Sequence, residues 1–263
     1  FEKLLSFQLL NSVDSIVVCG TTGEASTMSD DEKSSVIKCA VDFVDRKVPI
    51  IVGCGSNDTN KAIFNAKMAE SLGADGLLVV TPYYNKCTQS GLIKHYSKIA
   101  DSVSIPIILY NVPSRTGVNI EPETCFELSK VSNIVAIKEA SGNISQVAKI
   151  SALCNDNLFI YSGNDDQVIP ILSLGGIGVI SVLSNIKPLE THNMVTSFFD
   201  GNLSASKNLQ LGLLPLISAL FCEVNPIPVK YALNILGFDF GVPRLPLSEL
   251  SSKNKLLLDN LLA

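Results

Sequence analysis

The stretch Asn133-Ile134-Val135-Ala136-Ile137-Lys138-Glu139-Ala140 carries four consecutive apolar residues that lead straight into a lysine. A short apolar run rich in β-branched side chains is typical of a strand buried on both faces, as in parallel sheets. Burying a lysine is costly, and desolvation lowers its pKa, so that a neutral amine becomes available to attack a carbonyl. Lys138 is therefore a candidate Schiff-base nucleophile; the alternative is a lysine that emerges into solvent where its strand ends.

Six further apolar runs have the same character, and each is followed by a segment with helical spacing. They cover residues 14–20, 49–53, 76–81, 106–110, 158–162 and 178–182. Strict alternation of strand and helix predicts a parallel sheet, either doubly wound or closed as a (β/α)8 barrel. No Gly-x-Gly-x-x-Gly follows a strand, and the glycines of Gly175-Gly176-Ile177-Gly178 precede one, which is typical of a turn. Chain length and repeat favour the (β/α)8 TIM barrel.

The strand count is one short of a barrel, and the chain opens with a helical pattern over residues 1–12. We therefore expect the first barrel strand to lie upstream of Phe1 and to be missing from this sequence. On this basis residues 1–187 form the barrel without its first strand, and residues 188–263 form its last helix and a C-terminal helical region. That region is expected to be helical throughout, with breaks near Gly201, Pro226 and Pro243.

Composition narrows the class of protein. The 263 residues are 46% hydrophobic with a net charge of −5, which argues against a nucleic-acid partner. No apolar run reaches the roughly 18 residues that cross a bilayer, and the start does not resemble a signal peptide. Seven cysteines without a Cys-x-x-Cys pair indicate a reducing cytoplasm, and two isolated histidines, His95 and His192, do not suggest a zinc site.

A parallel barrel carries its active site at the C-terminal ends of its strands. Each of the residues at these ends has an ordinary explanation by itself, because glycines are typical of turns and tyrosines are amphipathic residues at the rim of a barrel. A lysine, three tyrosines and an arginine together on one rim nevertheless favour an active site. The strand ends read Gly20-Thr21-Thr22-Gly23-Glu24, Thr81-Pro82-Tyr83-Tyr84-Asn85, Tyr110-Asn111-Val112-Pro113-Ser114-Arg115-Thr116-Gly117, Lys138-Glu139-Ala140, Ser162-Gly163-Asn164-Asp165 and Ile180-Ser181.

With these motifs the chain resembles the pyruvate-dependent class I aldolase family, which includes dihydrodipicolinate synthases and N-acetylneuraminate lyases. The similarity runs from residues 1–12 to Asn225-Pro226-Ile227-Pro228-Val229-Lys230, and Arg115 matches the synthase branch. It implies condensation of pyruvate with L-aspartate-4-semialdehyde to 4-hydroxy-tetrahydrodipicolinate, the first committed step of the diaminopimelate route to lysine. Another aldolase or lyase of the family, or a barrel that only binds a keto acid, stays an alternative.

The resemblance also implies roles for single residues. Lys138 would form the Schiff base with pyruvate, so no separate cofactor or metal is expected. Tyr110 would move protons, and Thr21 would link it to Tyr84 in a relay. Tyr84 would reach the site of a neighbouring subunit, which implies a homo-oligomer, in the family usually a tetramer built as a dimer of dimers.

Substrate contacts follow from the same resemblance. Thr22, with backbone groups near Gly163 and Ile180, would hold the pyruvate end. Arg115 offers a planar fork suited to the carboxylate of the semialdehyde.

The family resemblance also places a lysine-binding cleft at the dimer interface. Lysine-sensitive relatives have a glutamate where this chain has Lys61, so like charges would meet and we expect weak or absent inhibition by lysine. The alternative is that Lys61 turns into solvent and Asp30 compensates. The cleft would involve Ala25, Ser26, Asp30, Lys33, Asn57, Lys61 and Tyr83.

Two motifs of protein kinases also occur. Val135-Ala136-Ile137-Lys138 and Asp239-Phe240-Gly241 match them literally. Neither histidine is followed by Arg-Asp, and no glycine-rich loop precedes the lysine strand, so a kinase is not predicted.

Overall fold

A curled parallel sheet forms the centre of the computed structural model, which describes residues 1–263. Its seven strands follow one another in chain order, and all neighbours are parallel. The strands are β1 (Ile16–Val18), β2 (Ile50–Gly53), β3 (Gly76–Val80), β4 (Ile107–Asn111), β5 (Ile134–Glu139), β6 (Phe159–Ser162) and β7 (Gly178–Val179). The predicted parallel α/β architecture is confirmed, while closure into an eight-stranded barrel stays a prediction.

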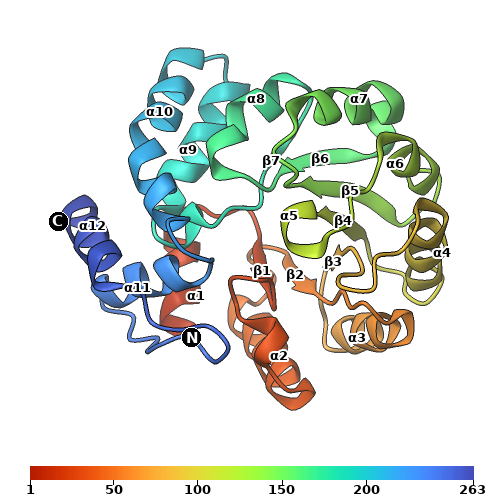
Figure 1. Ribbon diagram of the computed structural model, residues 1–263, viewed down its shortest axis with the longest axis horizontal. Coiled ribbons are helices and arrows are strands. Elements are labelled where there is room, and N and C mark those ends of the chain that lie inside the picture. Colours follow the sequence, from red (N-terminus) through yellow and green to blue (C-terminus); the bar gives the residue numbers. More distant parts are fainter.

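Helices form an outer ring around the curled sheet (Figure 1). Ser29 and Glu32 form a capping box at the start of α2. The ring comprises α2 (Asp30–Val44), α3 (Thr59–Ser71), α4 (Gln89–Ala100), α6 (Pro122–Leu128), α7 (Ile144–Cys154) and α8 (Val168–Ser173). Shorter elements are α5 (Pro113–Thr116), η1 (Ala25–Thr27), η2 (Asn155–Asn157), η3 (Asp165–Gln167) and η4 (Leu183–Asn185).

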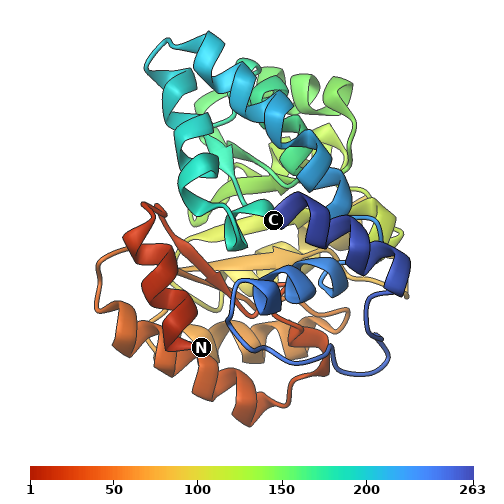
Figure 2. The same ribbon diagram turned by 90° about the vertical axis from the view of Figure 1, so that its left-hand side faces the viewer.

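The C-terminal part consists of α9 (Pro188–Phe199), α10 (Leu203–Leu220), α11 (Ile227–Ile235) and α12 (Ser252–Leu262). The breaks expected near Gly201, Pro226 and Pro243 are present, but the prediction of helix throughout was wrong, because residues 236–251 form an extended loop. This loop packs on α1 (Glu2–Leu10), where the Phe238 ring lies 5.4 Å from that of Phe7. Figure 2 shows α11 and the loop beside the N-terminal part of the chain.

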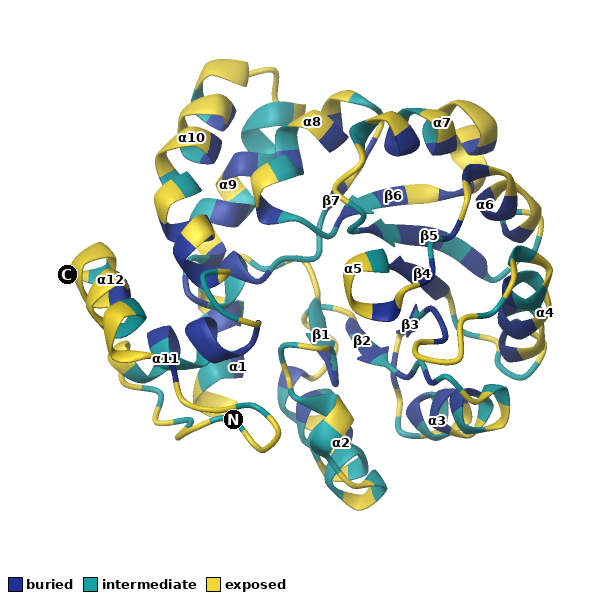
Figure 3. Cartoon of the chain, viewed as in Figure 1, coloured by how far each residue is buried: buried dark blue, intermediate teal, exposed yellow.

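Residues of the central strands β3 and β4 are buried along nearly their whole length (Figure 3), which explains their uninterrupted apolar sequences. Along β4, Ile107 and Leu109 belong to the core between sheet and helices, whereas Ile108 and Tyr110 belong to a second cluster inside the curl. Lys138 is the register partner of Tyr110. Because neighbouring residues in register share a face, the strand pattern directs Lys138 to the inside of the sheet.

All seven cysteines are free, as their spacing suggested. None of the helices combines the length and the apolar character that a membrane span requires.

Candidate active site

A cavity of about 540 Å³ is lined by residues at the C-terminal ends of the strands together with residues of α1, β1 and α11. Tyr84 does not line it; this side chain is 89% exposed on the loop after β3. The cavity brings together the other candidate residues from the sequence: Thr21, Thr22, Tyr110, Arg115, Lys138, Gly163 and Ile180.

Lys138 and Tyr110 form the centre of this cavity. They are paired on β5 and β4, and the Lys138 Nζ lies 4.5 Å from the centre of the Tyr110 ring. The pKa of Lys138 is lowered to about 8, mainly by burial; the carboxylate of Asp165 opposes this change and Arg115 adds to it. A fraction of the amine is therefore neutral near neutral pH and able to attack a carbonyl.

Tyr110 is 8% exposed, and burial raises the pKa of its phenol. Arg115 and Thr21 act in the opposite direction. The phenol thus keeps its proton at neutral pH, and the same oxygen can both donate and accept a hydrogen bond. A protonated phenol beside a partly neutral amine is suited to proton transfer during carbonyl chemistry.

Gly163 leaves space for the lysine at the end of β6. A Cβ at this position would lie 2.6 Å from the Ala140 Cβ and 3.1 Å from the Lys138 Cε. Its backbone N donates to the Glu139 carbonyl at 2.8 Å, and the Ile180 backbone N donates to the Ser162 carbonyl at 2.9 Å. Any larger residue at Gly163 would displace the lysine or the strand end that carries it.

A buried carboxylate fixes the strand ends next to the lysine. Glu139, which is 1% exposed, accepts hydrogen bonds from Asn111 Nδ2 at 2.9 Å, Gln146 Nε2 at 3.0 Å and the Ser141 backbone N at 2.7 Å. These donors come from β4, α7 and the loop after β5, so they join the elements around Lys138.

Sequence reasoning missed Asp165. This residue is 2% exposed, and its Oδ2 accepts hydrogen bonds from the backbone N of Val182 and of Leu183, both at 3.0 Å. Its Oδ1 is buried without a partner. Burial raises the pKa of Asp165, and its hydrogen bonds and Lys138 oppose this. The one signal in the sequence was its place two residues after Gly163 on the rim.

Asn225 was also missed, although the quoted motif before α11 begins with it. Its side chain is 5% exposed, its Nδ2 donates to Thr22 Oγ1 at 3.0 Å, and its backbone oxygen accepts from Arg115 Nη2 at 3.3 Å. Asn225 therefore connects two candidate substrate-binding residues that come from different strand loops.

No group of three or more histidine, cysteine, aspartate or glutamate side chains is placed to hold a metal ion. The cavity instead combines a nucleophilic amine, a phenol and a guanidinium group. These groups suit addition of the amine to a carbonyl compound that also carries a negative charge.

Comparison with known proteins gives consistent results. The model of the "Dihydrodipicolinate synthetase family" matches residues 1–263. The 4-hydroxy-tetrahydrodipicolinate synthase of Caldicellulosiruptor saccharolyticus is 61% identical over 256 residues, which are 97% of this chain and 86% of the relative.

Solved structures show the same similarity. Dihydrodipicolinate synthase from Thermotoga maritima superimposes with a TM-score of 0.97 at 45% identity, covering 99% of this chain and 90% of that one. The structure of dihydrodipicolinate synthase from Cyanidioschyzon merolae with lysine bound superimposes with a TM-score of 0.96 at 40% identity. The match covers 98% of this chain and 88% of that one.

Proposed function

Because the chain belongs to the dihydrodipicolinate synthetase family, we propose that it condenses pyruvate with L-aspartate-4-semialdehyde to 4-hydroxy-tetrahydrodipicolinate. This is a lyase-type reaction on the diaminopimelate route to lysine. The observation that carries the proposal is the Lys138 amine, with its pKa lowered to about 8, over the Tyr110 ring in the cavity.

The reaction begins when the neutral Lys138 Nζ adds to the ketone carbon of pyruvate. Loss of water gives the protonated imine, and loss of a proton from the methyl carbon converts it to the enamine. The enamine carbon then forms a bond to the aldehyde carbon of the second substrate, whose oxygen takes up a proton. Finally the amino group of the condensed product adds to the imine carbon, and the C–N bond to Lys138 breaks, which releases the lysine and closes the ring.

Three hydroxyl groups move the protons in this proposal. Tyr110 is adjacent to Lys138 and exchanges protons during addition, loss of water and ring closure. Thr21 links Tyr110 to Tyr84, which comes from a second copy of the chain. The influence of Thr21 on the Tyr110 pKa supports the first link of this relay.

The remaining candidate residues bind substrate. Thr22, with backbone groups near Gly163 and Ile180, holds the pyruvate end, and Arg115 binds the carboxylate of the semialdehyde. Their positions along one cavity wall support this division. The enzyme needs no cofactor beyond the covalent intermediate, and its working form is a homo-oligomer, a tetramer composed of two dimers.

The same proposal extends to the architecture. Residues 1–187 constitute the (β/α)8 barrel without its first strand, and residues 188–263 the last barrel helix with the C-terminal helical region. Packing of α10 on α8 and η3 supports the placement of this region against the sheet ends.

Borohydride reduction in the presence of pyruvate tests the central step. Mass spectrometry should find a reduced pyruvyl adduct on the peptide that contains Lys138, and Lys138→Ala should abolish both adduct and turnover. An adduct on another lysine, or an active Lys138→Ala variant, would contradict the mechanism. An adduct without product from aspartate semialdehyde would point to another aldolase of the family.

A further inference from the structure

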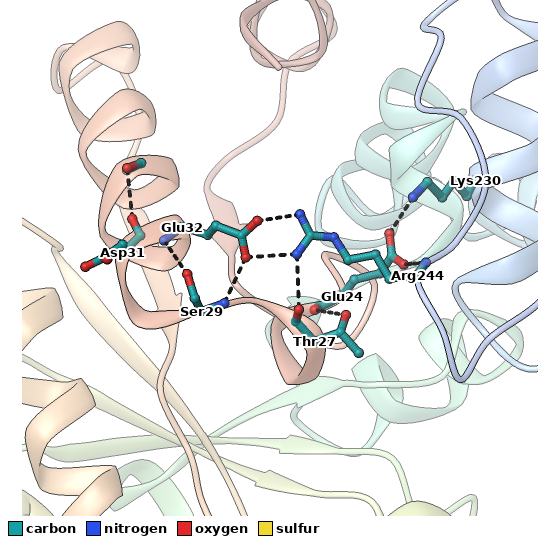
Figure 4. A network of polar contacts seen from close by, with 8 residues as sticks. Glu24, Thr27, Ser29, Asp31, Glu32, Lys230 and Arg244 are labelled. Carbon is teal, nitrogen blue, oxygen red and sulfur yellow. Dashed lines mark hydrogen bonds and ion pairs between the residues drawn. The ribbon is translucent and has the colours of Figure 1, made fainter.

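The cavity wall contains a charged pair that the proposed reaction does not use. Lys230 Nζ on α11 lies 2.5 Å from Glu24 Oε2 on the loop after β1, and the two side chains are only 15% and 13% exposed. Both residues line the cavity. Figure 4 shows the pair with its neighbours.

Glu24 closes the turn that carries the two candidate threonines. Its backbone N donates to the Thr21 carbonyl at 3.1 Å, and its φ of +57° places it in the left-handed region. A residue with a side chain adopts this conformation at a cost in free energy, and it persists where the surroundings enforce it. The side-chain contacts of Glu24 therefore add to the backbone hydrogen bonds that hold the Thr21-Thr22 turn.

Arg244 completes these contacts from the loop after α11. Its backbone N donates to Glu24 Oε1 at 2.7 Å, so both carboxylate oxygens of Glu24 are held by the C-terminal part of the chain. Its guanidinium donates to the Thr27 carbonyl at 3.1 Å and to both carboxylate oxygens of Glu32, at 2.8 and 2.6 Å (Figure 4). Glu32 in turn accepts from the Ser29 backbone N in the α2 capping box.

We propose that Glu24, held by Lys230 and by the backbone N of Arg244, is a positioning residue for pyruvate. It acts through the turn that presents Thr21 and Thr22, and it makes the C-terminal segment a functional part of the active site. The inference rests on the proposed function, because it assumes that Thr22 holds the pyruvate carboxylate. The contact of Asn225 Nδ2 with Thr22 Oγ1 adds a second link from the same segment.

The two ion pairs do not contribute equally. Arg244 and Glu32 are 50% and 42% exposed, so water and salt screen their attraction. Glu24 and Lys230 are largely buried, and removal of one partner leaves the other charge unpaired in the cavity wall. Lys230 is therefore the position at which the proposal is tested.

The test compares steady-state kinetics of Lys230→Met, Lys230→Arg and Glu24→Gln with the unmodified protein. Lys230→Met should raise the KM for pyruvate about tenfold, which corresponds to about 1.4 kcal/mol, while kcat changes less. Lys230→Arg keeps the charge and should restore most of the affinity. Lys130→Met is the matched control, because Lys130 forms an exposed pair with Glu127 at 2.7 Å outside the cavity, and its KM should not change.

KM separates positioning from a general loss of structure, because a smaller folded fraction lowers the apparent kcat but leaves KM unchanged. An unchanged pyruvate KM in both Lys230→Met and Glu24→Gln would overturn the proposal. If Lys230→Met does not fold, Glu24→Gln, which keeps the side-chain shape, gives the decisive KM. Borohydride trapping on the unmodified protein keeps the two hypotheses apart, since absence of the Lys138 adduct there contradicts the proposed function instead.

Discussion

At Lys138, two opposing influences act on one amine. Burial lowers its pKa and the Asp165 carboxylate raises it, and the net result is a pKa of about 8. At pH 7 about one tenth of the lysine is then neutral, against well under a thousandth for a lysine in water. Asp165 limits the neutral fraction, but the same charge would stabilise the protonated imine of the proposed reaction.

This balance gives a prediction for the pH dependence. Imine formation needs the neutral amine, so its rate should rise with pH and level off above about 8. Asp165→Asn removes the carboxylate that raises the Lys138 pKa, so the midpoint should move to lower pH. The measurement is the rate of the borohydride-trapped adduct as a function of pH. Asp166→Asn, which changes an exposed neighbour, should leave the midpoint in place, and an upward shift in Asp165→Asn would refute the assignment.

Arg115 gives a second prediction at this scale. Arg115→Ala should reduce kcat/KM for aspartate semialdehyde, because a charge-assisted contact to its carboxylate is lost. The reduction should correspond to a loss of about 2–4 kcal/mol in transition-state stabilisation. Adduct formation with pyruvate should remain largely intact. Arg46→Ala, outside the cavity, serves as the control. Equal damage to both steps would show that Arg115 supports the cavity as a whole, through its contact to the Asn225 carbonyl, instead of selecting the second substrate.

The sequence predicted the rim residues because their place at strand ends is a local property. Asp165 and Asn225 were not predicted as site residues, because their contacts are not local in the sequence. Asp165 depends on the backbone N of Val182 and Leu183 after the next strand, and Asn225 contacts a threonine 203 positions away in the sequence. Neither partner is visible from the residue type alone.

Among the elements, the strands were predictable in position but not in length. The apolar runs at 14–20 and 178–182 are longer than the strands that they form, because β1 has only three residues and β7 only two. These two strands lie at the edges of the sheet, so each is paired on one side only. Hydrophobicity shows where a strand is buried, whereas its length depends on hydrogen bonds to a neighbour.

His95 on α4 gives a prediction on stability. Its Nδ1 lies 2.9 Å from Thr59 Oγ1 on α3, its Nε2 is buried without a partner, and burial lowers its pKa to about 4. Between pH 6.5 and 4 the unfolded chain binds a proton that the folded chain does not. The contribution present at neutral pH is therefore lost as the pH falls through this range, by about 2–3 kcal/mol.

Urea unfolding at pH 7.5 and 4.5 measures this effect. His95→Gln should lose less stability on acidification than the unmodified protein. An identical pH dependence for His95→Gln would show that acidic residues account for the whole loss.

At the scale of the whole molecule, one proposed catalytic residue lies outside the cavity of its own chain. Tyr84 is 89% exposed, and its φ of +74° is uncommon for an aromatic residue. Both features fit a side chain that a second copy of the chain would cover. Mixing Tyr84→Phe with Lys138→Ala chains should restore up to about a quarter of the activity, since half of the random dimers would have one intact site of two.

The control mixes Tyr110→Phe with Lys138→Ala. Both changes affect residues of the same cavity, so no hybrid has an intact site and no rescue is expected. Absence of rescue in demonstrably mixed Tyr84→Phe oligomers would refute the action of Tyr84 in a neighbouring subunit.

Regulation by lysine also belongs to the scale of the whole molecule, and the contacts of Lys61 bear on the prediction of weak inhibition. Its Nζ lies 2.5 Å from Asp30 Oδ2, with side chains 37% and 45% exposed, and 4.5 Å from the centre of the Phe64 ring. Lys61 thus does not simply turn into solvent, and Asp30, whose pKa it lowers, is already paired. Asp30 is the one acid among the residues proposed for the cleft, so the ammonium group of an incoming lysine would meet Lys61 there.

We therefore expect weak inhibition by lysine, with half-inhibition above about 1 mM when both substrates are near their KM. Lys61→Glu reverses the charge, leaves two acids for the ammonium group and should lower the half-inhibiting concentration. Lys67→Glu is the control: it makes the same change on α3 outside the proposed cleft and should not affect inhibition. Strong inhibition of the unmodified enzyme, unchanged in Lys61→Glu, would show that lysine is bound without any contribution from this position.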